Sequence, residues 1–71
     1  MHMGKEISKT EKGTWYGIIQ DAPNSFHISV SKDHLVLYDH VENPTNIENI
    51  HNKVRELEDE LLNRIQTQSN T

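Results

Sequence analysis

The side chains with the clearest chemical potential are carboxylates that gather in the second half of the chain. The run Glu56-Leu57-Glu58-Asp59-Glu60 places four acids around one turn of a predicted helix, with only Leu57 facing inward. Residues 39–60 contain seven acids and two bases, which give a local charge of −5. A cluster of this kind is either a solvated helix face or a surface that binds a basic protein.

Carboxylates on such a surface can stand where a DNA-binding protein expects phosphates, because phosphates dominate the electrostatic recognition of DNA. A protein that presents them would occupy the basic groove of its partner and exclude DNA by competition. We predict that the partner-binding surface consists of six acids, namely Asp39, Glu42, Glu56, Glu58, Asp59 and Glu60.

The sequence contains no motif for a catalytic nucleophile or for a metal site. Four histidines follow His2, but none of them belongs to an HExxH motif or to a helical pair at i, i+4. Ser25, Ser29 and Ser31 lack the context of a nucleophile elbow, cysteine is absent, and three glycines form no phosphate-binding loop. The sequence therefore predicts no enzyme, no metal site and no cofactor.

Length and composition narrow the class of protein further. The chain has 71 residues, a net charge of −4 and 32% hydrophobic residues, which predicts one small domain over residues 4–71. We interpret Met1-His2-Met3 as a cloning remnant. No apolar run approaches the roughly 20 residues of a membrane span. The acidic balance argues against direct binding to nucleic acid or to anionic membranes.

The order of turns and apolar residues predicts an α+β fold, in which a small antiparallel β-meander of three to four strands precedes one C-terminal helix. The meander is expected over residues 5–38, with strands at 5–9, 15–19, 26–31 and 34–38. A polar link over residues 39–45 leads into a helix over residues 45–66. Residues 67–71 are polar and are expected to fray.

The predicted helix has a marked start and one apolar stripe. Thr45 and Glu48 have the spacing of a capping box. The stripe recurs every three or four residues and consists of Ile47, Ile50, Val54, Leu57, Leu61 and Ile65. Its ends lie 18 residues apart, which is five turns of a straight helix. This spacing favours a helix lying on a sheet, with pairing between two helices as the alternative.

The predicted strands at 15–19 and 34–38, which flank the strand at 26–31, are apolar on both faces, whereas one helix covers one face only. Phe26, Ile28 and Val30 are expected to face one side, and His27 and Ser29 to form a polar centre on the other. Because the core is small, this apolar surplus predicts a homodimer. The residues assigned to the core or to the dimer contact are Tyr16, Ile18, Val36, Tyr38, Ile50, Val54, Leu57 and Leu61.

In its length, its acidity, its lack of cysteine and its acidic run from Glu56 to Glu60, the chain resembles the small proteins that bacteriophages make to take over host functions. Some of these proteins are DNA mimics, and one type inhibits the nucleoid protein HU by occupying its DNA-binding arms. The resemblance implies a basic, HU-like partner and a location in the cytoplasm of an infected bacterium.

Two other functions remain open from the sequence. A small homo-oligomeric adaptor would bind another protein through the apolar sheet face. A DNA-binding dimer would use the basic arm of Lys5, Lys9 and Lys12, which the overall acidic charge makes the least favoured of the three. Binding through carboxylates weakens steeply as salt rises, whereas apolar docking does not, so salt dependence separates the inhibitor from the adaptor.

Overall fold

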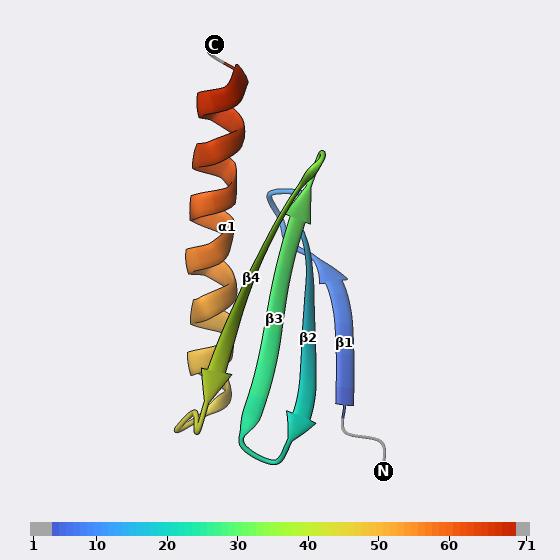
Figure 1. Ribbon diagram of the computed structural model, residues 1–71, viewed down its shortest axis with the longest axis vertical. Helices are drawn as coiled ribbons and strands as arrows, with labels where there is room; N and C mark the ends of the chain where they lie inside the picture. Colours follow the sequence, from blue (N-terminus) through green and yellow to red (C-terminus); the bar gives the residue numbers. More distant parts are fainter. Residues whose placement is uncertain (1–3, 70–71) are drawn as a thin grey trace.

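The computed structural model describes residues 4–69, and the predicted α+β fold is confirmed there (Figure 1). Its elements are β1 (Gly4–Lys9), β2 (Trp15–Ala22), β3 (Ser25–Lys32), β4 (Leu35–Glu42) and α1 (Ile47–Ser69). The strands form one antiparallel sheet in the order β1-β2-β3-β4. The proposed cloning remnant at residues 1–3 and the last two residues of the predicted frayed tail lie outside the described residues.

The hairpin between β3 and β4 shows why the sequence makes a meander. Asp33 adopts a φ of 58° in the tight turn, a conformation that aspartate tolerates better than most residues. Beyond this turn the two strands pair without interruption, from Lys32 opposite Leu35 to Ser25 opposite Glu42. β4 therefore continues four residues past the predicted end at residue 38, because ladder hydrogen bonds to β3 hold polar residues in the strand as well.

Helix α1 packs on one face of the sheet, over β3 and β4, and leaves β1 at the far side (Figure 1). The alternation in β3 is confirmed, since Ile28 and Val30 are buried against the helix. The core of the described chain consists of Ile18, Ile28, Val30, Ile50, Val54, Leu57 and Leu61. The helix-on-sheet interpretation of the stripe is thus confirmed.

The start of α1 differs from the predicted capping box. Asn46 is the capping residue, because its Oδ1 accepts from the backbone N–H of Glu48 at 2.9 Å. Asn49 completes the box, with its Oδ1 accepting from the backbone N–H groups of Thr45 at 2.8 Å and of Asn46 at 3.2 Å. The prediction was one residue early. Ile47 consequently lies in the first helical turn, 63% exposed, and does not belong to the buried stripe.

The end of α1 also differs from the prediction. The helix runs to Ser69, three residues past the expected end at residue 66. In the added turn the Thr67 hydroxyl donates to the backbone carbonyl of Asn63 at 2.9 Å. Such a bond to the preceding turn is compatible with helical backbone and satisfies a side chain that otherwise favours loops.

Candidate protein-binding surface

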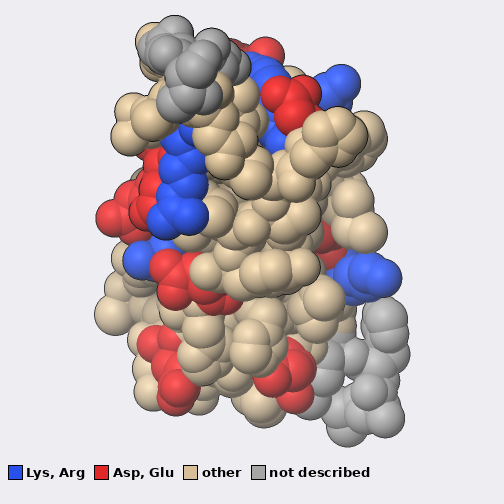
Figure 2. Space-filling model, turned by 45° about the horizontal axis from the view of Figure 1, so that its top comes forward, with Lys and Arg blue, Asp and Glu red and all other residues tan. Residues whose placement is uncertain are grey.

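The predicted acidic residues do not form one continuous surface. Asp39 lies on the helix side of β4, where Lys53 of α1 contacts it at 3.4 Å and contacts Glu56 at 3.2 Å. One turn further along α1, Arg64 contacts Glu60 at 2.7 Å. Acidic and basic side chains are likewise interspersed on the face drawn in Figure 2. These carboxylates thus sit along the β4 side of the helix, each next to a base.

Local contacts keep Asp39 and Lys53 in their charged forms. The pKa of Asp39 lies below its usual value, because the backbone N–H of His40 donates to its carboxylate and Lys53 lies close by. The pKa of Lys53 is raised, first by its hydrogen bond to Glu56 and then by the charges of Asp39 and Glu56. At neutral pH the β4 side of α1 therefore carries fixed charges of both signs.

The two other exposed acids of the predicted surface, Asp59 and Glu42, lie away from the β4 side of α1. Asp59 lies toward the loop between β1 and β2, where Lys12 contacts it at 3.7 Å. Glu42 ends β4 on the opposite face of the sheet from α1, with His40 at 3.6 Å. The acids that share the helix surface are therefore Glu56, Asp59 and Glu60, and Asp39 borders them through Lys53.

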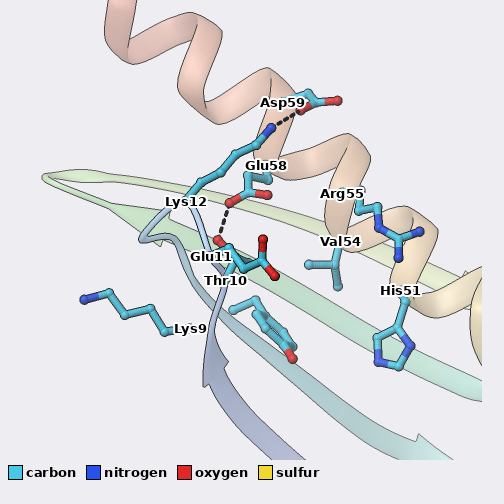
Figure 3. Close-up of a pocket in the computed structure, with 10 residues that line it drawn as sticks. Lys9, Thr10, Glu11, Lys12, His51, Val54, Arg55, Glu58 and Asp59 are labelled. Atoms are coloured by element: carbon cyan, nitrogen blue, oxygen red, sulfur yellow. Dashed lines mark hydrogen bonds and ion pairs between the residues drawn. The ribbon is translucent and has the colours of Figure 1, made fainter.

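The prediction that Glu58 lies on the solvated side of the helix is wrong. Its residue is only 6% exposed, and its carboxylate accepts a hydrogen bond from the hydroxyl of Thr10 (Figure 3). Glu58 follows Val54 by four residues and precedes Leu61 by three, so it lies beside the buried stripe. This spacing indicates that Glu58 is buried, whereas the run of acids around it indicates exposure. The structure agrees with the spacing.

A groove opens where α1 leaves the β1–β2 side of the sheet uncovered. It has a volume of about 580 Å³ and runs between the helix and the loop over residues 10–14 (Figure 3). Its lining residues are Lys9, Thr10, Glu11, Lys12, Tyr16, His51, Val54, Arg55, Glu58 and Asp59. Charges of both signs line this open groove, so its chemistry favours no single class of ligand.

Tyr16 and Ile18, assigned to the core or the dimer contact, both lie on the helix side of the sheet. Ile18 belongs to the core, and Tyr16 packs partly buried against it. Val36 and Tyr38 lie on the other face, 46% and 76% exposed. The structure therefore divides this predicted group between two faces.

The sheet face turned away from α1 carries most of the exposed apolar side chains of the described chain. We call this the open face, and its large apolar residues are Ile7, Trp15, Ile19, Val36 and Tyr38. Lys9 lies over the ring of Trp15, with its Nζ 5.5 Å from the ring centroid. The predicted polar centre is also present, since Ser29 and His27 occupy the middle of this face.

A histidine pair on the open face joins β3 and β4. His27 and His40 stack with ring centroids 4.6 Å apart. Asp21 contacts His27 Nε2 at 2.8 Å, and the Ser25 hydroxyl lies 2.9 Å from His40 Nε2. The pKa of Asp21 is lowered, first by a hydrogen bond from Ser25 and further by His27.

A serine, a histidine and an acid follow one another here as in a catalytic triad, namely Ser25, His40 and Glu42, although the Glu42 carboxylate is 3.6 Å from His40 Nδ1. A triad also needs oxyanion donors and a hollow for the acyl group. The strand backbone here is engaged in the sheet ladder, and the groove beside α1 is lined by other residues. These contacts instead tie the ends of β3 and β4 together.

Within residues 4–69, no group of three or more His, Cys, Asp or Glu side chains is arranged to hold a metal ion. In the same part of the chain, no helix is long and apolar enough to cross a membrane. Comparison with protein-family models, with curated proteins and with solved structures found no match.

Proposed function

We propose that this protein is a non-enzymatic inhibitor that binds a basic, HU-like DNA-binding protein through carboxylates presented in place of DNA phosphates. The observation that carries the proposal is the set of exposed acids on the outer surface of α1, namely Glu56, Asp59 and Glu60. Four residues advance about 6 Å along a helix. That rise is close to the roughly 7 Å covered by two nucleotide steps of one DNA strand.

The ion pairs within the protein leave these acids free to bind a partner. The side chains of Glu56, Asp59 and Glu60 are 68%, 72% and 51% exposed in their pairs. An exposed pair contributes about 0–1 kcal/mol, and a carboxylate has lone pairs for more than one donor. Arginines of a basic partner can therefore join or replace Lys53 and Arg64, with bidentate geometry that a lysine lacks.

The proposed partner surface is smaller than the one predicted from the sequence. It comprises Glu56, Asp59 and Glu60, bordered by Asp39, whereas Glu58 is committed to Thr10 inside the protein. Glu42 faces the other side of the sheet and is not part of it. By this proposal the protein acts in the cytoplasm of an infected bacterium, where it competes with DNA for the partner.

Displacement of DNA tests this function. A fluorescently labelled DNA duplex is bound to purified bacterial HU, and the protein is titrated in while anisotropy is recorded. We expect free DNA to be released, with a competitor affinity that falls steeply between low and physiological salt, because exposed charges are screened. Failure to release DNA at any salt concentration would contradict the proposal.

The open face favours a second candidate function, a small homo-oligomeric adaptor. Its supporting observation is the exposure of large apolar side chains on a face that α1 does not cover, with Tyr38 76% exposed. Single exposed apolar residues are ordinary, but a contiguous group marks an interaction site. Binding to another protein through this face would persist at high salt.

A further inference from the structure

The open face combines a projecting side chain with a hollow of matching size. The hollow has a volume of about 170 Å³ and lies over β1 and β2. Gly17 and Ser29 lie at its base, and Ile7, Trp15 and Ile19 also line it. The projecting side chain is Tyr38 on β4.

Gly17 is what keeps the hollow open. A Cβ atom at this position would stand 3.2 Å from the hydroxyl of Ser29, and any larger side chain would project into the space above the sheet. The neighbouring serines on β3 are also short. A strip of small residues therefore lies between two apolar borders, with Trp15 and Ile19 on one side and Tyr38 on the other.

The register of the sheet relates the hollow to the projecting side chain. Gly17 pairs with Ser29 across β2 and β3, and Ser29 pairs with Tyr38 across β3 and β4. Gly17 and Tyr38 are thus equally distant from Ser29, on opposite sides. A two-fold axis that passes over Ser29 along β3 exchanges their positions, so it places Tyr38 of each copy over Gly17 of the other.

The same axis brings other complementary groups together. Ser31 pairs with both Trp15 and Val36, so Trp15 of one copy faces Val36 of the second copy. Lys5 of β1 lies at the level of His40 but two strands from β3, so it stands beside the β4 edge of the second copy, two residues from Glu42. Because both contacts occur twice, the surface is complementary to itself, as a two-fold dimer requires.

The size of the surface also fits a second copy of the chain. The five large apolar side chains are 46% to 76% exposed and together form a patch at the upper end of the roughly 300–600 Å² that one patch covers on a monomer. A standard interface uses about 800 Å² per partner, and the serines and histidines between these residues supply the rest. Stacked sheets lie about 10 Å apart, a gap that an aromatic side chain spans.

We infer that a second copy of this chain docks face to face on the open face, with Tyr38 of each copy seated in the Gly17 hollow of the other. Helix α1 of each copy then lies on the outside of the dimer. The acidic helix surfaces remain accessible on opposite sides. This inference does not rest on the proposed function, since it concerns the other face of the sheet.

Sedimentation equilibrium and tryptophan fluorescence test the inference together. Trp15 is the single tryptophan of the chain and is 51% exposed on the open face. We expect twice the chain mass of 8.3 kDa at micromolar concentration. We also expect the emission of Trp15 to shift to shorter wavelength as concentration rises, because docking removes it from water.

Tyr38→Ser is expected to return the protein to a monomer and to abolish the concentration-dependent shift of the Trp15 emission. Ile47→Ser is the matched control, since Ile47 is 63% exposed but lies on α1, away from the open face, and it should remain a dimer. Val36→Ser serves as a second open-face variant, and circular dichroism confirms the fold of each. A monomeric wild type, or a dimer that survives both open-face substitutions, would overturn the inference.

Discussion

Replacing Thr10 by valine tests the hydrogen bond between the Thr10 hydroxyl and the buried carboxylate of Glu58. Valine keeps the shape of threonine but removes the hydroxyl that donates to the buried carboxylate of Glu58. The same hydroxyl accepts from the backbone N–H of Thr14 at 3.2 Å, so this weaker bond is lost as well. A hydrogen bond to a charged group contributes about 1.5–3 kcal/mol. We therefore expect Thr10→Val to lower the free energy of unfolding by about 2–3 kcal/mol.

A double-mutant cycle separates this bond from general effects of each substitution. Glu58→Met replaces the carboxylate by an apolar side chain of similar length. In the double variant no carboxylate is left without its donor, and the lost bond from Thr14 is common to both proteins that carry Thr10→Val. Thr10→Val with Glu58→Met should therefore cost less than the sum of the single changes. We expect a coupling energy of about 1–2 kcal/mol.

Urea unfolding at pH 7, followed by circular dichroism, provides the free energies. Protein concentration is kept equal for all four proteins, because dimer formation would shift their apparent stability. A coupling energy below about 0.3 kcal/mol would refute the reasoning, since it would mean that water replaces Thr10 at the carboxylate without loss.

Two further predictions concern the packing of α1 and its charges. Leu61 is fully buried, so Leu61→Ala should lower the free energy of unfolding by about 2–5 kcal/mol, whereas the exposed Gln66→Ala should leave the melting temperature nearly unchanged. In the folded state the pKa of Asp39 lies below its ordinary value of 3.8. The contribution of Asp39 to stability is therefore present above pH 3.8 and is lost as the pH falls through the lower pKa of the folded state. Asp39→Asn lacks this contribution, and thermal melts between pH 2 and 5 (roughly the carboxylate range) should show a shallower acid loss than the wild type.

The sequence correctly predicted those elements in which a periodic pattern of apolar residues is bounded by a clear turn. Phe26, Ile28 and Val30 alternate cleanly, and the structure places the helix over that side of β3. Strand ends were harder to predict, because β4 continues through Asp39 and His40, whose place in the strand comes from pairing with β3. Cross-strand pairing is not encoded in local propensity.

The acidic surface shows a different limit of sequence reasoning. A run of four acids around Leu57 indicates a solvated helix face, yet one of them is buried. Which acid is buried depends on where the helix axis lies over the sheet and on Thr10, 48 positions away in the chain. The positions of Lys12 beside Asp59 and of Lys53 beside Asp39 depend on the same packing.

The central claim is that exposed carboxylates of α1 bind an HU-like partner in place of phosphates, and the most direct test measures the affinity for purified HU after those charges are removed. The test protein carries Glu56→Gln, Asp59→Asn and Glu60→Gln. The matched control removes three acids that lie off the helix, through Glu6→Gln, Glu11→Gln and Asp33→Asn, so both proteins change net charge equally. Three exposed pairs of up to about 1 kcal/mol each give a loss of roughly tenfold to hundredfold. We predict this loss for the helix variant and an affinity near that of the wild type for the control, whereas equal affinities for the two variants would contradict the claim.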